Sequence, residues 1–573
     1  MQKLKLILNT VFILFLLDTF EIKAQSLSTG TTILEDYYRR EQLLGNINLN
    51  HSFVSYPLFP VEAFNQENPY DPDNLFSNSR LQNPNDSLEL EDGKYSLKRL
   101  PILWKQQTNY HHPEEINDGA MIPARGYQTL LSTGIYFKYD HLSIKLQPEF
   151  VYAANLEYDG FPLTRTEQAW ADRRWYEYYY YYLNYIDAPE RFGETAYQRV
   201  FWGQSSIRLT FNSISLGLST ENLWWGPGMR NSLIMTNSAP GFTHFTINTV
   251  KPIETIIGSF EGQVIAGWLK SSGFMPPGSY RENSNWELYY IPKLDDGRYI
   301  NGMILSYQPK WVPGLFLGLI RSFQVYHEDK GEKFIDYLPI FSFFGMENGG
   351  GDVEVYNMRR DAYNSLFFRF VWPESQVEIY GEYGRSDYFW NSRDLVVQMD
   401  HSSAYNLGFR KLITLNPVKK EYLQAQLEIT QLAQNANTIK RGGGGWGMDK
   451  VVRDGYTHNG QFLGSGIGPG SNLQTLDISW LKGLKKIGLR VERFAHNEDF
   501  FFAAIKDVRS HWVDMSGALV GNWDYKNFLF MLELKAVVSI NYEWEYDFPT
   551  VEYWTPGVDT YNYHGQLSII YRF

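Results

Sequence analysis

Alternation of apolar and polar residues on both sides of tight turns limits most strongly how this chain can fold. In residues 129–153, leucine, isoleucine, phenylalanine and tyrosine mostly fall at every second position on either side of Asp140-His141, with polar residues between them. Residues 207–219 repeat the pattern around Asn212-Ser213. Because successive side chains of a strand point to opposite faces, each strand has one apolar and one polar face. The repetition predicts an extended antiparallel sheet built from hairpins.

Further short reversals separate strand-length segments along the chain, and longer stretches rich in glycine, asparagine and aromatic residues follow them. Short turns on one side and long loops on the other are typical of a transmembrane antiparallel β-barrel, so we predict an all-β outer-membrane barrel of about 16 to 18 strands. The reversals lie at residues 310–314, 373–376, 416–420, 482–486 and 524–527.

The chain ends on an alternating segment whose last residue is aromatic. Leu567, Ile569, Tyr571 and Phe573 share one face of the predicted strand. A terminal aromatic residue on such a strand resembles the signal recognised by the barrel insertion machinery. Phe573 is therefore predicted to have this structural role, with the insertion machinery and outer-membrane lipids as partners.

The first residues predict export. Lys3 and Lys5 precede an uninterrupted apolar run at 11–17, and a cleavage site follows at Ala24, so residues 1–24 are expected to be a signal peptide. No later segment approaches the roughly 18 apolar residues that a transmembrane helix needs. A membrane would therefore have to be crossed by strands.

Composition agrees with a barrel and excludes other classes. Aromatic residues make up 17% of the chain although the mean hydropathy is −0.37, as expected where lipid-facing and lumen-facing side chains alternate between aromatic girdles. The net charge of −12 argues against a nucleic-acid partner. Cysteine is absent, which excludes disulfides and thiolate zinc sites. We expect no cofactor.

The region before the first clear hairpin has a different pattern. Residues 31–45 have apolar positions at helical spacing, and residues 58–90 are rich in asparagine, aspartate and proline. We expect residues 25–125 to form a periplasmic helical and irregular region resembling a plug, and residues 126–573 to form the barrel. An unstructured N-terminal tail is the alternative.

The sharpest motif is Trp224-Trp225-Gly226-Pro227-Gly228, followed by Arg230 and Asn231. A strand of about ten residues from the Asn212-Ser213 turn would carry it to the extracellular rim. Gly-Pro-Gly forces a structural turn there. The two indoles beside Arg230 and Asn231 would suit a sugar, whose C–H faces stack on aromatic rings. From spacing alone, a tryptophan girdle at the membrane interface is favoured over a glycan site.

The same block carries a family resemblance. Residues 216–241, LGLSTENLWWGPGMRNSLIMTNSAPG, strongly resemble the Wzi-type capsule assembly family. Residues 117–128, NDGAMIPARGYQ, resemble the Bacteroidetes branch that includes the gliding motility protein RemB, with Asn117, Asp118 and Gly119 as motif residues. Further matches are EIYGEYG at 378–384, HSSAYNLG at 401–408 and GYTHNGQFLG at 455–464.

The resemblance implies an outer-membrane barrel of about eighteen strands with a periplasmic helical element. In the capsule branch it implies a non-catalytic surface lectin that binds polysaccharide, and with it Trp224, Trp225, Arg230 and Asn231 become the candidate glycan ligands. In the gliding branch it implies a docking body for motility or type nine secretion components. A passive porin is the second alternative.

Patterns that could indicate catalysis or a metal have simpler explanations. His111 and His112 lie near Glu114, Glu115 and Asp118, but their spacing matches no defined metal site, so we expect a solvated loop. Glu378 and Glu382 share one strand face, which a polar lumen explains without glycoside hydrolysis. The glycine run at 442–447 lacks the strand and helix that a nucleotide site requires. We predict no catalytic residues and no metal ligands.

Overall fold

The computed structural model describes residues 25–573, apart from 67, 73–89, 92–94, 115, 163–173, 284, 333, 339, 341–358, 387–391, 436–439, 441–444, 506 and 547–555. The predicted signal peptide, most of the predicted irregular stretch at 58–90, Glu115 and Gly442 to Gly444 lie outside the described residues.

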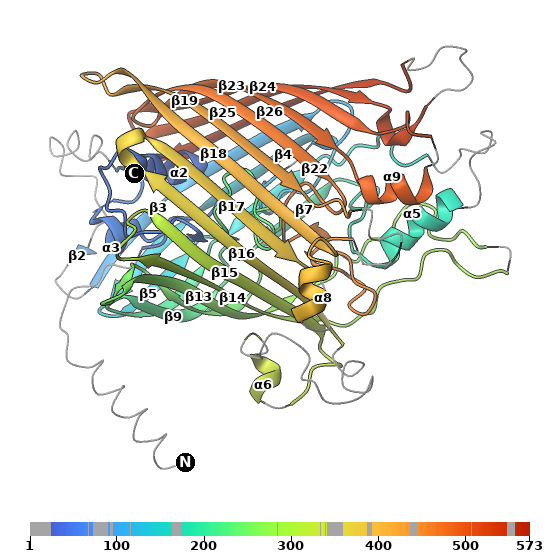
Figure 1. The fold of residues 1–573 in the computed structure, drawn as a ribbon, viewed down its shortest axis with the longest axis horizontal. Helices are drawn as coiled ribbons and strands as arrows, with labels where there is room; N and C mark the ends of the chain where they lie inside the picture. The colour runs from blue at the N-terminus through green and yellow to red at the C-terminus, as the bar shows by residue number, and fades with distance from the viewer. Residues whose placement is uncertain are drawn as a thin grey trace.

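The described residues form a closed antiparallel barrel of eighteen wall strands, two of which are interrupted (Figure 1). The fold class and the even strand number predicted from the alternation are confirmed. The uninterrupted wall strands are β3(Tyr95–Asn109), β4(Gly126–Tyr139), β9(Ile214–Ser219), β11(His244–Thr249), β13(Gly258–Leu269), β14(Arg298–Pro309), β15(Leu315–Tyr326), β16(Arg360–Trp372), β17(Val377–Arg385), β18(Ser403–Asn416), β19(Glu421–Gln431), β22(Asn472–Lys482), β23(Lys485–Ala495), β24(Val513–Tyr525), β25(Phe528–Ile540) and β26(Thr560–Tyr571). The interrupted pair consists of β5(Leu142–Leu146) with β6(Glu149–Ala153), and β7(Tyr197–Phe201) with β8(Ser206–Phe211).

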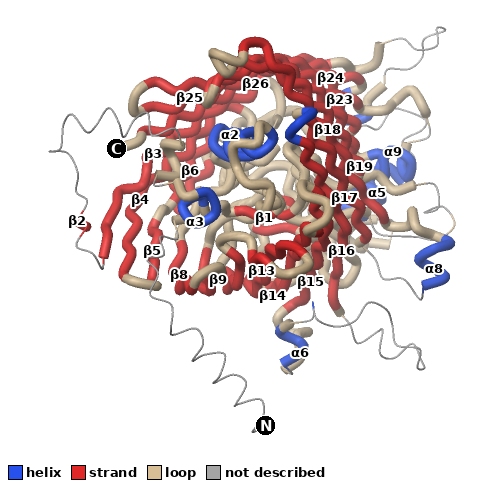
Figure 2. The backbone as a smooth tube through the Cα atoms, turned by 60° about the vertical axis from the view of Figure 1, so that its left-hand side comes forward, coloured by secondary structure: helices blue, strands red, loops and turns tan. Residues whose placement is uncertain are grey.

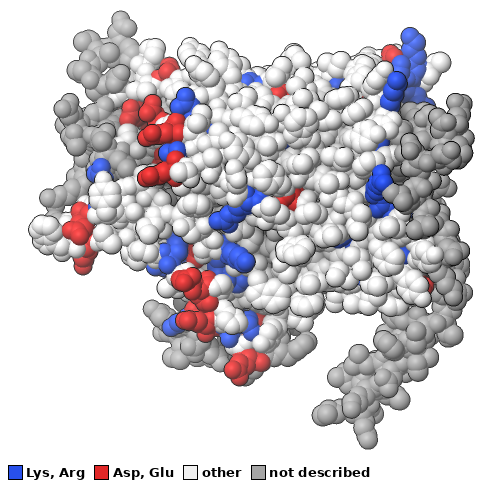
Figure 3. Space-filling view, turned by 180° about the vertical axis from the view of Figure 1, so that it is seen from behind, with Lys and Arg blue, Asp and Glu red and all other residues white. Residues whose placement is uncertain are grey.

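The alternation in the sequence becomes an apolar outer wall and a polar inner wall. On β4, Leu131 and Ile135 expose 44% and 46% of their surface, whereas Ser132 between them is buried. Figure 3 shows few charged side chains across the middle of the barrel wall. Among the described residues, no helix is long and apolar enough to cross a membrane. Strand pairing around a closed ring leaves no unpaired edge to face lipid.

The barrel has a short-turn end and a long-loop end. All the tight turns predicted from the sequence lie at the short-turn end, where Asp140 and Asn212 take the positive φ angles that tight hairpins require. Long connections leave the opposite end and carry α5(Arg174–Asn184), α6(Phe334–Tyr337), α8(Ser392–Val397) and α9(Glu498–Ala504) (Figure 1).

The wall begins earlier than the predicted boundary at residue 126. Strand β3 pairs with β4 and with β26, and this second pairing closes the ring. The sequence hides β3 because its alternation slips at a register shift between Leu100 and Leu103, beside Pro101. The predicted start of the barrel at 126 is therefore wrong.

The predicted N-terminal helix is α2(Thr32–Leu43), and it lies within the ring of strands (Figure 2). Its apolar side chains, including Leu34 and Tyr38, pack in a buried cluster against the wall. Its charged side chains pair with the wall: Arg39 Nε donates to Glu378 Oε1 over 2.7 Å, and Asp36 pairs with Arg410.

Smaller elements complete the structure. Strand β1(Ser55–Tyr56) pairs with β10(Trp224–Trp225), and α3(Pro60–Phe64) lies beside α2 at the short-turn end (Figure 2). The others are β2(Leu90–Glu91), β12(Ile253–Glu254), β20(Thr457–His458), β21(Gln461–Phe462) and the 3-10 turns η3(Pro373–Ser375) and η5(Tyr542–Trp544).

Candidate functional site

The connection after β9 leaves the wall and enters the lumen. We call residues 220–243 the inner loop. Its two-residue strand β10 pairs with β1, so Trp224 lies opposite Tyr56 and Trp225 opposite Ser55. Apolar side chains of this loop form a large buried cluster with inward-facing wall residues and with Trp446 and Tyr456 of a later loop. The inner loop is therefore part of the barrel core.

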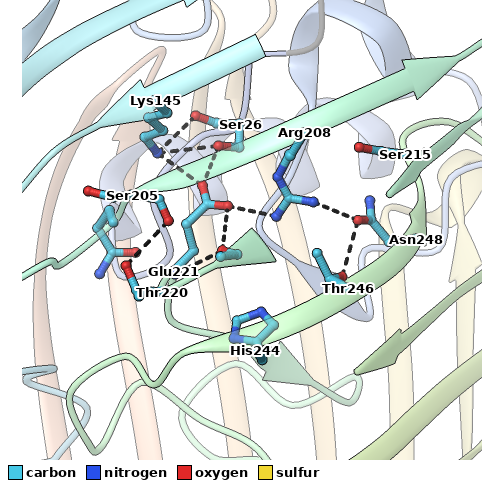
Figure 4. Close-up of polar contacts among 12 residues, drawn as sticks. Ser26, Lys145, Ser205, Arg208, Ser215, Thr220, Glu221, His244, Thr246 and Asn248 are labelled. Atoms are coloured by element: carbon cyan, nitrogen blue, oxygen red, sulfur yellow. Dashed lines mark hydrogen bonds and ion pairs between the residues drawn. The ribbon is translucent and has the colours of Figure 1, made fainter. Parts of the chain in front are cut away.

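A buried carboxylate turns the chain inward at the start of the inner loop (Figure 4). Glu221 has no exposed surface. Its Oε2 accepts from Arg208 Nη2 at 2.7 Å, and its Oε1 lies 3.2 Å from Lys145 Nζ and accepts from the Ser26 hydroxyl. Arg208 also donates to Asn248 on the neighbouring strand β11. Two wall cations thus hold one loop carboxylate, because a buried charge is stable only when it is paired.

Wall carboxylates also hold the second half of the motif. Glu428 on β19 accepts from the backbone amides of Met229, Arg230 and Asn231 at 2.7 to 3.0 Å. Glu382 on β17 accepts from Leu233 N and from the Ser232 hydroxyl at 3.1 Å. Glu382 thus faces the lumen, and Glu378, the other carboxylate of the predicted face, does so too, because it pairs with Arg39 of α2 inside the barrel.

The glycines of the motif permit close packing. Gly226 has a φ of +130°, and a Cβ added there would lie 2.2 Å from Ser232 Oγ. A Cβ on Gly228 would lie 1.7 Å from the Asn231 carbonyl oxygen. Only glycine fits either position.

The predicted rim position of the two tryptophans is wrong. Trp225 and Asn231 have no exposed surface, and Trp225 Nε1 donates to Gln263 Oε1 at 2.8 Å. Trp224 and Arg230 line an internal cavity of about 300 Å³ between α2 and the wall from β22 to β3. Arg230 is held there by Glu492, 3.0 Å away. The sequence could not show this path because it depends on Lys145, which lies 76 positions before Glu221 and meets it only in the folded sheet.

The other motif block contacts the inner loop directly. Asn117 Nδ2 donates to the Arg230 carbonyl oxygen at 2.7 Å, and Gly119 N donates to the Asn237 carbonyl oxygen at 2.7 Å. Asp118 forms an ion pair with Lys105 on β3. The two blocks singled out in the sequence are therefore one packed unit inside the barrel.

The long-loop end carries a cluster of aromatic side chains, which we call the aromatic cap. Helix α5 packs against α9, with the rings of Tyr182 and Phe500 5.9 Å apart. Tyr179 stacks on Phe161 with ring centroids 3.9 Å apart. Further rings come from the loop before β24, which carries Trp512, and from the loop after β25, which carries Trp544.

A projecting loop, residues 278–289, extends beyond α5 (Figure 1). Tyr289 stacks on Tyr180 with centroids 6.0 Å apart, and Asn184 of α5 donates to the Tyr289 carbonyl oxygen at 2.9 Å. The loop exposes 79% of Tyr280 and 84% of Trp286. Both rings are thus offered to solvent on a support that is fixed to the cap.

Polar groups surround the exposed indole. The side-chain oxygen of Asn283 accepts from the backbone amides of Asn285 and Glu287, which shapes the tip around Trp286. Arg281, Glu282 and Glu287 are its charged neighbours in the loop. Aromatic rings beside amides and charged groups form a surface that can bind a polar ligand with apolar faces.

Comparison with known proteins shows the family. The model of the family described as capsule assembly protein Wzi matches residues 117–529, well over half of the chain. This chain belongs to the Wzi family. It is an outer-membrane β-barrel, and its long-loop end is the extracellular one.

Several solved structures are similar to this Wzi-family chain, and the first named here has the same barrel fold. One is Wzi of Escherichia coli, an outer-membrane protein involved in group 1 capsule assembly, with 12% identity, coverage of 96% of this chain and 100% of that chain, and a TM-score of 0.57. OccAB2 of Acinetobacter baumannii has 9% identity, coverage of 82% and 97%, and a TM-score of 0.38. OccK7 of Pseudomonas aeruginosa has 9% identity, coverage of 84% and 99%, and a TM-score of 0.36. No curated protein sequence matches the chain.

The aromatic cap of this Wzi-family barrel was not predicted from the sequence. A signal was present, because five consecutive tyrosines, Tyr178 to Tyr182, cannot alternate between a lipid face and a lumen face. Such a run does not belong in a wall strand, and the structure places it on α5. The two exposed rings of the projecting loop carried no comparable signal.

Proposed function

We propose that this barrel is a non-catalytic outer-membrane protein that binds surface polysaccharide, through aromatic and polar side chains of its extracellular loops. Family membership supports a role in capsule assembly. The Escherichia coli Wzi, which has the same fold, is described as a carbohydrate-binding β-barrel. The observation that carries the proposal is the pair of exposed rings, Tyr280 and Trp286, on a loop fixed to the aromatic cap.

The glycan contact belongs on the projecting loop and not on the tryptophan motif. Trp225 and Asn231 are fully buried, so they cannot touch a ligand without unfolding of the core. Trp224 and Arg230 reach only the internal cavity. Aromatic rings that face water on an extracellular loop can stack on a ligand, and stacking on one ring contributes about 0.5–1.5 kcal/mol.

Binding of surface polysaccharide to alanine variants tests this proposal. We expect Trp286→Ala with Tyr280→Ala to weaken binding by about tenfold or more, because each lost stacking contact is worth on the order of 1 kcal/mol. Trp311→Ala is the matched control, since Trp311 is 70% exposed but lies in the turn between β14 and β15 at the opposite end. Far-UV circular dichroism in detergent verifies the barrel in each variant.

Two results would contradict the proposal. Unchanged binding by the double variant would remove the projecting loop as the glycan contact. A loss of polysaccharide binding seen only in Trp224→Ala or Arg230→Ala would place the binding site in the internal cavity.

Membership in the gliding branch stays a prediction based on residues 117–128. A docking body for gliding or type nine secretion proteins would copurify with a stoichiometric partner from detergent-solubilised membranes. A polysaccharide-binding barrel requires no such partner.

A further inference from the structure

His112 lies in a buried cluster and not in the solvated loop that its sequence neighbours predict. It follows β3 at the extracellular end of the barrel and exposes 3% of its surface. Its ring packs on Tyr542, with centroids 4.8 Å apart. Asn562 on β26 donates to its carbonyl oxygen at 2.9 Å. The imidazole is therefore fixed in position.

Two carboxylates from different parts of the chain meet this histidine. Glu114 comes from the same loop, and Asp514 comes from β24, some 400 residues later. One ligand atom of each of the three side chains lies within 4.8 Å of the other two. Glu114 and Asp514 expose only 9% and 3% of their surface. The spacing in the sequence could not reveal this group because its third member is brought in by barrel closure.

Few positively charged groups pair with the two carboxylates of the cluster. Lys535 pairs with Glu114 Oε1 but is shared with Glu492, 2.9 Å away. Asp514 has no lysine or arginine partner within the part of the chain that the structure describes. Its oxygens accept from Trp512 Nε1 at 3.0 Å and lie 2.7 Å from His496 Nε2. The two carboxylates thus face one lysine, which is shared with Glu492, and the imidazole of His496.

The histidine is suited to be a ligand. A neutral imidazole keeps a lone pair on one ring nitrogen, and this nitrogen can bind a metal ion. Its Nδ1 lies 3.1 Å from Nδ1 of His111, and its Nε2 lies 3.5 Å from the Ser539 hydroxyl. With Nδ1 engaged by His111, Nε2 is the nitrogen available to an ion.

We propose that His112, Glu114 and Asp514 bind a zinc ion, with water at a fourth position. One imidazole nitrogen and two carboxylate oxygens are a donor set that zinc accepts at about 2.0–2.2 Å, so the side chains need to close by less than about 1 Å. His496 orients Asp514 from behind, as partners of ligating carboxylates do. The ion fastens the loop that carries Asn117 to β24, a role independent of polysaccharide binding.

Zinc uptake by the full-length barrel in detergent tests the proposal. The protein is stripped with a chelator, dialysed against zinc chloride and analysed for bound metal. We expect one zinc per chain, and at least about tenfold weaker binding in His112→Ala and Asp514→Asn. His511→Ala is the control, because His511 lies near the same loop end but pairs with Glu498 outside the cluster. Zinc should also slow hydrogen exchange in residues 110–125.

The isosteric Asp514→Asn keeps an acceptor for Trp512, and circular dichroism verifies that each variant retains its sheet. The proposal is overturned if the stripped wild-type chain takes up no stoichiometric zinc. It is equally overturned if both cluster variants bind zinc as the wild-type chain and His511→Ala do.

Discussion

At the scale of single residues, the motif that marks the family acts here through buried contacts. Glu221 places one carboxylate between Lys145 and Arg208, and all three side chains are almost wholly buried. Trp225 fills the space beside Gly302 on β14, where an added Cβ would lie 2.8 Å from the indole. These residues hold the inner loop against the wall, so a block that suggests a ligand site serves packing.

Neutralising Glu221 tests this role. In Glu221→Gln, two buried cations lose their carboxylate, and we expect the free energy of unfolding to fall by about 3–5 kcal/mol. Urea titration followed by tryptophan fluorescence measures the change. Glu374→Gln in the exposed turn between β16 and β17 is the control and should leave the midpoint unchanged. Equal midpoints for both variants would show that the pairing does not stabilise the inner loop.

At the scale of elements, helix α9 shows how the cap is built. Its N-cap Asn497 accepts from Phe500 N at 3.1 Å, and Phe500 and Phe501 are buried against α5 and the loops. Asp499 in the first turn accepts from Gln434 N at 2.7 Å. Burial raises the pKa of the Asp499 carboxyl to about 7, although this hydrogen bond opposes the rise.

The stability of α9 should therefore depend on pH. An unfolded aspartate ionises near its ordinary pKa of 3.8, whereas folded Asp499 keeps its proton to about pH 7. The folded state binds more protons in this window, so stability falls as pH rises from about 4 and levels off above about 7. We expect Asp499→Asn to increase the protection of residues 498–504 from hydrogen exchange more at pH 8 than at pH 5.

Asp507 in the following loop is the matched control for this experiment. Its pKa is lowered, mainly by the side-chain hydrogen bond from Arg509, so Asp507→Asn should not protect α9 at pH 8. Equal protection by Asp499→Asn at both pH values would contradict a raised pKa.

At the scale of the whole molecule, segments of the chain itself fill the lumen. Helix α2, strand β1 and the inner loop occupy the ring of strands, and a later loop adds Trp446 and Tyr456 to the same core. Carboxylates of the wall bind these inner segments at several places. Glu378 pairs with Arg39 of α2, and Glu428 accepts hydrogen bonds from amides of the inner loop. A cavity of about 300 Å³ lies between α2 and the wall.

A filled lumen predicts little ion flow. Planar-bilayer recordings of the wild-type barrel should show no stable open channel, because ions would have to displace packed side chains. Replacing both Glu378 and Glu428 with alanine should increase brief openings by loosening the inner content. Stable ohmic steps from the wild-type protein would favour the porin alternative.

The sequence by itself determined most of the wall, with β3 as the exception. Period-two alternation in segments such as 129–153 and tight turns such as Asn212-Ser213 appear in the structure as predicted. The final strand is also present, but it ends at Tyr571, two residues before Phe573. Such patterns are local: each strand residue needs only to match lipid on one side and the lumen on the other. Helix α2 was predictable for the same reason, since apolar spacing along one helix face is a local property.

Only the tertiary structure decided what fills the barrel and what projects from it. The inward path of Trp224 and Trp225 depends on Lys145 and Arg208, which meet Glu221 through the pairing of β5 with β8 and of β8 with β9. The meeting of His112 with Asp514 and the exposure of Trp286 also depend on packing between distant segments. Long-range contacts leave no periodic trace in a single sequence, because their partners are specified by the closed ring and not by neighbouring residues.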